Sequence, residues 1–323
     1  MRVGLIGAGN VAQMAQLPAL ATRPDVTLAG LVTRTVETAQ ANLRCWPIER
    51  TYATAAEMLE SAMLDAIFVL TPRDAHAEAV QLALRAGVDV YSEKPLASTA
   101  AEARDLADLA TSSGRLLMVN FNRRFSPLYL AAKRAFTSGP PQFVVAQKNR
   151  AGTEYRATFE NAIHMIDLLR WYCGEAESVH AQACTTDAYF EDGVVALIRF
   201  KAGSVASLIA ARTAGLWDER IELYGDEKTA RVVAPDYVAI SREGSTSRVD
   251  MRARAYGWVQ ARHTLGFQTA VEHFLDHVLS REPVESDGHS AAHTQELVEC
   301  ILKAAELPAT DAEGFEWSSR ASR

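Results

Sequence analysis

Near the start of the chain, a short apolar run leads directly into a glycine turn and then into an amphipathic stretch. The run is Val3-Gly4-Leu5-Ile6, and the turn consists of Gly7, Ala8, Gly9, Asn10, Val11 and Ala12. In such a turn the first glycine permits a tight bend and the second lets backbone N–H groups approach a pyrophosphate. The small last residue lets the helix pack against the strand. This setting predicts a dinucleotide-binding domain, with cofactor contacts from Gly7, Gly9, Asn10, Val11 and Ala12.

The alternation of apolar runs and amphipathic stretches continues to about residue 120. Four more apolar runs follow the first, at 28–32, 66–70, 88–91 and 116–119. Their composition is typical of strands buried on both faces. Two Ala- and Leu-rich stretches between them, 75–86 and 99–113, are each followed by a glycine, as helices often are. Because alternating strands and helices favour a parallel sheet, we expect a Rossmann domain over residues 1–120.

After residue 120 the pattern changes. One strong helix is expected over residues 159–173, and a string of short strand-like segments follows it. The turn signal Lys201-Ala202-Gly203 separates two of these segments and predicts a hairpin. We therefore expect an α/β protein in which residues 121–323 form an α+β domain with a large, open and mostly antiparallel sheet.

Composition and charge limit the classes of partner. The 323 residues carry 40 acidic and 33 basic side chains, a formal net charge of −7. Such a surface has no general attraction for nucleic acid or for anionic membranes. The four cysteines are scattered, and no apolar run reaches the roughly 18 residues of a membrane span. We expect a cytoplasmic protein with no metal site and no membrane or nucleic-acid partner.

The end of the second apolar run bears on the kind of dinucleotide. A carboxylate there would bind the adenosine ribose 2′-hydroxyl, but this chain has Thr33-Arg34-Thr35. An arginine with hydroxyl neighbours can donate to a 2′-phosphate, which a carboxylate would repel. Thr33 and Arg34 therefore favour NADP(H), with NAD(H) as the alternative if Arg34 is a solvated loop residue.

Motifs further along the chain resemble those of a known family. Thr71-Pro72 is followed by His76, and Glu93-Lys94-Pro95 follows the fourth apolar run. With Asn120-Phe121-Asn122-Arg123-Arg124-Phe125, these residues resemble the Gfo/Idh/MocA family of glucose–fructose oxidoreductases and inositol dehydrogenases. The similarity is closest to the branch named after a virulence-factor homologue. It implies that Thr71, Pro72, His76, Glu93 and Lys94 line the cofactor site, and Asn120 is placed to bind the nicotinamide carboxamide or the substrate.

The resemblance implies that Lys94 lies beside the nicotinamide and moves a proton while hydride passes to or from a sugar or polyol carbon. The residues agree with this role. Oxidising an alcohol requires a base, and a lysine can act as one when its surroundings lower its pKa toward neutrality. Pro95 disfavours helical geometry at Lys94, which favours a position at a strand end, where open α/β sheets bind ligands.

A second group of candidates lies on the helix expected after Phe159. The family pattern has an Asp, a His four residues later and then another Asp, and its first two members complete the catalytic set with the lysine. Here the positions hold Glu160, His164 and Asp167, which fall on one stripe of a helix. His164 matches, and its imidazole can bind a substrate hydroxyl or assist proton transfer. Glu160 departs from the pattern by one methylene, which leaves its catalytic role open. For His164 and Asp167 the alternative is a structural hydrogen-bonded pair.

These residues predict an NADP(H)-dependent oxidoreductase of a sugar or polyol. Arg123, Tyr155 and Asp167 are the substrate candidates, with solvated arginines as the alternative for the basic side chains. Large exposed sheets tend to be buried by symmetry, so we expect a homodimer or homotetramer through the sheet of the second domain. Two other functions stay open: a glycoside hydrolase that keeps its dinucleotide bound, and a dinucleotide-binding sensor without turnover.

Overall fold

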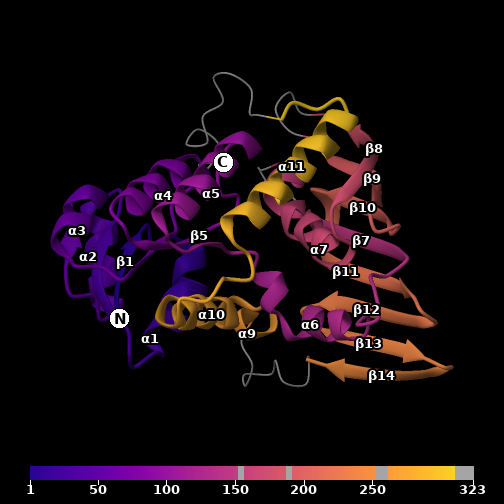
Figure 1. Ribbon diagram of the computed structural model, residues 1–323, viewed down its shortest axis with the longest axis horizontal. Coiled ribbons are helices and arrows are strands. Elements are labelled where there is room, and N and C mark those ends of the chain that lie inside the picture. The colour runs from indigo at the N-terminus through magenta and orange to yellow at the C-terminus, as the bar shows by residue number, and fades with distance from the viewer. Residues whose placement is uncertain (152–155, 187–190, 252–260, 310–323) are drawn as a thin grey trace. The chain divides into compact units, whose positions relative to one another are not determined.

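The chain folds into two compact units. The computed structural model describes residues 1–151, 156–186, 191–251 and 261–309 (Figure 1). The first unit is formed by residues 1–122 and 266–293, and the second by residues 123–265 and the chain from 294 onward. Helix α11 (Gly288–Ala304) begins in the first unit and ends in the second.

The first unit contains a six-stranded parallel sheet in the order β3-β2-β1-β4-β5-β6. Its strands are β1 (Arg2–Ile6), β2 (Thr27–Val32), β3 (Thr51–Tyr52), β4 (Ala66–Val69), β5 (Asp89–Ser92) and β6 (Leu117–Val119). Each pairs in parallel with its neighbours. Strands β4, β5 and β6 are buried along their whole length, as expected for strands covered on both faces. The predicted parallel Rossmann-type sheet is confirmed.

Local capping signals explain where several helices of this unit begin. The helical segments here are η1 (Ala12–Gln16), α1 (Leu17–Ala21), α2 (Val36–Cys45), α3 (Ala55–Ser61), η2 (Arg73–Ala75), α4 (His76–Arg85) and α5 (Ala100–Ser113). A threonine precedes each of α2, α3 and α5 and accepts a hydrogen bond from the backbone N–H three residues on. Such caps satisfy N–H groups that have no partner within the helix. Helix α5 ends at Gly114, whose φ of 65° suits glycine.

Residues 266–293 pack within the first unit, whereas the sequence pattern predicted them in a domain of residues 121–323. Helix α10 (Phe267–Ser280) places Phe274 against Phe68 of β4, with the ring centroids 5.6 Å apart. Beyond α10, the carbonyl oxygen of Ser286 accepts the backbone N–H of Val119 at 2.8 Å. The segment therefore covers part of the parallel sheet and adds a partner to the edge of β6.

The second unit contains an eight-stranded sheet in the order β14-β13-β12-β11-β7-β10-β9-β8. Its strands are β7 (Phe143–Ala151), β8 (Ala176–Cys184), β9 (Gly193–Phe200), β10 (Val205–Ala211), β11 (Thr213–Gly225), β12 (Lys228–Ala234), β13 (Tyr237–Arg242) and β14 (Ser245–Asp250). The β7–β10 pair is parallel, and the other pairs among the described strands are antiparallel. The large, mostly antiparallel sheet and the hairpin at Lys201 are confirmed.

Helices pack against one face of this sheet (Figure 1). The helical segments are η3 (Asn122–Phe125), α6 (Pro127–Arg134), η4 (Ala157–Ala162), α7 (Ile163–Cys173) and α9 (Ala261–Thr264). Helix α6 contacts β12 and β13, and α7 contacts β7. Within the described ranges, no helix is long and apolar enough to cross a membrane, and no three His, Cys, Asp or Glu side chains are grouped as metal ligands.

Candidate active site

The carboxyl ends of the parallel strands bring most of the predicted cofactor residues to one edge of the first unit. Gly7 follows β1, Thr71 comes after β4, Glu93 follows β5 and Asn120 follows β6. Backbone hydrogen bonds tie neighbouring strand ends together: the N–H of Glu93 donates to Val69, and the N–H of Asn120 donates to Ser92 at 2.8 Å. Thr71 adds a buried hydroxyl with no partner among the described residues. This edge is where open parallel sheets bind ligands.

The two glycines of the turn have different surroundings. Gly7 has a φ of +88°, and a Cβ there would lie 2.6 Å from the carbonyl oxygen of Leu70. Gly9 is the opposite case, because a Cβ built on it would meet nothing within 4 Å. The backbone at Gly9 is therefore open to a ligand, which fits the close approach of a pyrophosphate. Asn10 and Val11 are exposed beside it, and Ala12 is buried.

The segment after β2 presents donors without a carboxylate. Thr35 caps α2, and the Thr33 hydroxyl donates to the carbonyl oxygen of Thr35 at 2.9 Å. Arg34 is exposed and has no hydrogen-bond or ion-pair partner among the described residues. A guanidinium at the start of a ten-residue helix suits an anion, since the helix dipole and the charge have the same sign.

His76 holds the backbone around Lys94. Its ring is buried, with Nδ1 2.6 Å from the carbonyl oxygen of Pro95 and Nε2 2.8 Å from that of Thr71. Burial lowers the pKa of His76, although both carbonyls favour the protonated ring. Because both ring nitrogens face protein carbonyls, the geometry favours a positioning role for His76. The ring joins the end of β4 to the chain directly after Lys94.

Glu93 is held by two buried amides. Its Oε1 accepts from the side-chain N–H groups of Gln16 and Asn120, and its Oε2 accepts the backbone N–H of Lys94 at 3.4 Å. Gln16 and Asn120 are fully buried, whereas Lys94 is partly exposed. No sequence motif marks Gln16 as a site residue. Its only signal was a glutamine between Ala15 and Leu17, in a stretch that packs inward.

In the second unit, Glu160 lies in η4 and His164 lies in the first turn of α7. The Oε2 atom of Glu160 accepts the backbone N–H of Arg156 at 2.9 Å, so the carboxylate reaches back to the start of the helical segment. The additional methylene relative to Asp permits this reach. His164 is only partly buried, while the residues on both sides of it are enclosed. Tyr155 lies outside the described residues.

Asp167 and Arg124 form a buried ion pair in the second unit. The guanidinium donates to both carboxylate oxygens, at 2.8 and 2.6 Å, and the Thr294 hydroxyl donates to one of them at 3.0 Å. The Asp167 side chain has no exposed surface. The geometry therefore favours the structural alternative for Asp167 over substrate binding.

Arg123 belongs to a second buried cluster, around Glu219. Its guanidinium donates to both oxygens of Glu219 at 2.8 Å, and Tyr129 and Lys148 donate to the same carboxylate. Burial alone would raise the pKa of Glu219, but the charges of Arg123 and Lys148 hold it below its usual range. Because Arg123 is committed to Glu219, the geometry favours a structural role for it as well.

Comparisons with known proteins find related sequences and a similar fold. Residues 1–121 match the model of an oxidoreductase family with an NAD-binding Rossmann fold, and residues 130–231 match a GFO/IDH/MocA C-terminal domain. An inositol 2-dehydrogenase of Rhizobium meliloti (strain 1021) is 25% identical over 325 residues, covering 94% of this chain and 96% of the relative. Another, of Paracoccus denitrificans (strain Pd 1222), is 29% identical over 73% of this chain and 74% of the relative. The crystal structure of the dehydrogenase MviM from Clostridium difficile has a TM-score of 0.85 at 25% identity, covering 94% of this chain and 99% of that chain.

Proposed function

The chain belongs to the Gfo/Idh/MocA oxidoreductase family, and we propose that it moves a hydride between NADP(H) and a secondary alcohol or ketone carbon of a sugar or polyol. The observation that carries the proposal is the edge of the parallel sheet, where Lys94 comes two residues after β5. Strand β4 separates β5 from β1, the strand that leads to the glycine turn. Relatives named inositol 2-dehydrogenases support a polyol as the substrate class.

Each proposed site residue has a chemical task. The backbone at Gly9 binds the pyrophosphate, and Arg34 binds the 2′-phosphate. Lys94 takes the hydroxyl proton when an alcohol is oxidised and returns it in the reverse direction, while His164 binds the substrate hydroxyl. When bound, the nicotinamide accepts or supplies the hydride. Glu160 is a positioning residue, since its carboxylate caps the segment that leads to His164.

A substrate screen tests the reaction class. Purified protein with NADPH or NADP⁺ and a panel of sugars, sugar phosphates and inositols should change absorbance at 340 nm with at least one of them. If the protein cleaved a glycoside without a net change in NADPH concentration, this result would favour a glycoside hydrolase over a dehydrogenase. Tight dinucleotide binding with no turnover of any kind would favour the sensor.

The cofactor preference depends on Arg34. Replacing it with alanine should raise the Kd for NADPH about tenfold, since a charge-assisted contact is lost, and leave the Kd for NADH unchanged. Cofactor fluorescence titration measures both constants. Arg44→Ala is a matched control, because Arg44 is exposed near the other end of the same helix. Tighter binding of NADH than of NADPH by the unaltered protein would contradict the assignment.

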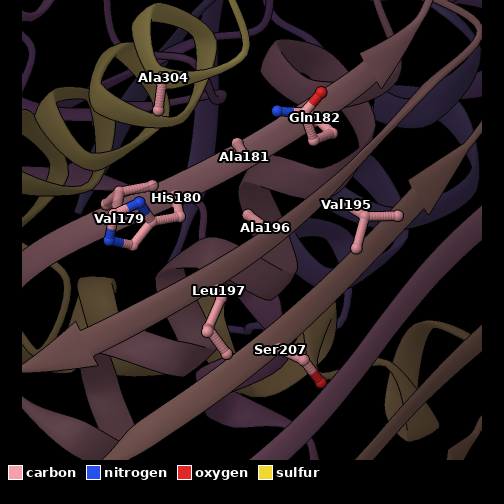
Figure 2. A pocket seen from close by; sticks show the side chains of 9 residues that line it. All are labelled: Val179, His180, Ala181, Gln182, Val195, Ala196, Leu197, Ser207 and Ala304. Carbon is pink, nitrogen blue, oxygen red and sulfur yellow. The ribbon is translucent and has the colours of Figure 1, made fainter.

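We further propose that a second copy of the chain covers the open face of the eight-stranded sheet. Phe143, Val195 and Leu197 are 59%, 54% and 51% exposed there. Strand register sets Val195 beside Ile209, an apolar pair that spans β9 and β10, and sets Leu197 beside Ser207. A pocket of about 580 Å³ lies at this part of the sheet. Val195, Leu197 and Ser207 are among the residues that line it (Figure 2). An exposed apolar area of this kind is suited to burial against a second copy of the chain.

Changing this face should alter the oligomeric state. Leu197→Glu places a charge in the apolar area and should convert a dimer or tetramer into smaller species, as measured by sedimentation velocity. Leu279→Glu is the control, because Leu279 is exposed on α10 in the other unit. A monomeric unaltered protein, or an unchanged mass for Leu197→Glu, would rule out this interface.

The cytoplasmic location inferred from the sequence remains a prediction. The four cysteines form no disulfide, and Cys45, Cys184 and Cys300 are exposed. Free exposed thiols suit a reducing compartment.

A further inference from the structure

Gln16 connects the glycine turn to the residues around Lys94. It is the last residue of η1, the π-helix that follows the turn, and its side chain is fully buried. Its amide N–H donates to Oε1 of Glu93, and the same oxygen accepts from Asn120 at 2.7 Å. π-Helical turns are rare and often occur at functional sites. Here the π-helix carries the side-chain amide of Gln16, which reaches Glu93, the residue before Lys94.

The carboxylate of Glu93 determines how both amides are oriented. An ionised carboxylate only accepts hydrogen bonds, so the N–H groups of Gln16 and Asn120 must face it and their carbonyl oxygens must face elsewhere. Both oxygens, Gln16 Oε1 and Asn120 Oδ1, are buried, and neither has a partner among the described residues. Buried acceptors are nearly always paired in folded proteins. Two such oxygens on side chains that share one carboxylate indicate that a donor group binds here.

We propose that the carbonyl oxygens of Gln16 and Asn120 accept the two N–H bonds of the nicotinamide carboxamide. This inference rests on the proposed function. The chemistry matches, since a primary amide offers two donors and the pair offers two acceptors. The location also matches, because Gln16 follows the turn that is open at Gly9 and Asn120 follows β6. Both amides also donate to Glu93, which accepts the backbone N–H of Lys94. The proposed contacts therefore link the position of the nicotinamide ring to that of Lys94.

A cofactor analogue without the amide tests the proposal through binding. The 3-acetylpyridine analogue of NADP⁺ carries a methyl ketone in place of the carboxamide, so it has no N–H to donate. The unaltered protein should bind NADP⁺ about tenfold more tightly than the analogue, as measured by isothermal titration calorimetry. Gln16→Met should weaken NADP⁺ binding and bring this ratio close to one, with little change for the analogue.

Two further variants separate the roles of Gln16. Gln16→Lys keeps a donor for Glu93 but lacks the acceptor, so it should also lose the preference for NADP⁺ over the analogue. Met14→Ala is the control, because Met14 lies in the same π-helix with an exposed side chain, and its ratio should equal that of the unaltered protein.

The outcomes are distinct. Equal binding of NADP⁺ and the analogue by the unaltered protein would overturn the inference and assign the two oxygens to bound water, whatever the variants do. A Gln16→Lys protein that keeps the full preference would also overturn it. Failure to bind either dinucleotide would instead overturn the proposed function, and this inference with it.

Discussion

Replacing Lys94 with methionine should lower kcat by a factor of about 10³, the loss expected when a general acid–base group is removed. Methionine has a similar length but cannot take the hydroxyl proton. The Kd for NADPH should change little, because the proposed phosphate contacts come from Gly9 and Arg34. Steady-state kinetics with a substrate found in the screen and cofactor titration of the same variant measure the two effects separately.

Two control variants show whether a lower kcat of Lys94→Met comes from the lost proton transfer. Lys94→Arg keeps the positive charge, but a guanidinium stays protonated at working pH and cannot serve as the base, so this variant should be nearly as slow. Lys201→Met removes an exposed lysine from the β9–β10 turn and should leave kcat unchanged. If Lys94→Met kept more than a tenth of the rate, Lys94 would not be the proton-transfer residue.

Glu219→Gln should have the largest effect on stability, lowering the free energy of unfolding by about 3–5 kcal/mol. The change leaves the buried cations Arg123 and Lys148 facing a neutral amide. Urea unfolding followed by circular dichroism measures the loss. Glu222→Gln is the matched control, because Glu222 lies on the same strand, and its pair with the half-exposed Arg231 should contribute about 1 kcal/mol or less.

Lowering the pH should reduce the difference in free energy of unfolding between the unaltered protein and Glu219→Gln. Burial would raise the pKa of Glu219, but Arg123 and Lys148 outweigh it and hold the folded-state pKa below that of the unfolded chain. The unfolded chain therefore binds more protons in the acid range, and stability rises with pH there. The contribution of the carboxylate is complete above the ordinary pKa of a glutamate, about 4.3, and is lost as the pH falls through the folded-state pKa. A difference between the unaltered protein and Glu219→Gln that grew on acidification would contradict this assignment.

Several elements could be predicted because their causes are local. The glycine turn is encoded by the conformational freedom of Gly7, whose φ is positive in the structure. The parallel sheet follows from short apolar runs alternating with amphipathic stretches, since a strand buried on both faces leaves that pattern in any window of sequence. The position of Lys94 at a strand end follows from the run before it and the proline after it.

Other features depend on partners that are distant in sequence, and only the tertiary structure decided them. Asp167 is a plausible site residue on its helix, yet Arg124 occupies both of its oxygens. No local motif marks Gln16, because the residue to which it donates, Glu93, lies 77 positions away in the sequence.

Hydrophobic periodicity indicates that one face of a helix is buried, but it does not indicate which element covers that face. The sequence of α10 therefore does not predict that this helix packs on β4 of the first unit. The sequence by itself therefore determined the family and the two sheets and predicted which edge binds the nucleotide, because all three rest on local patterns. The structure decided which polar side chains are held by other protein groups and which retain buried atoms for a ligand. That distinction depends on long-range pairing, which no window of sequence records.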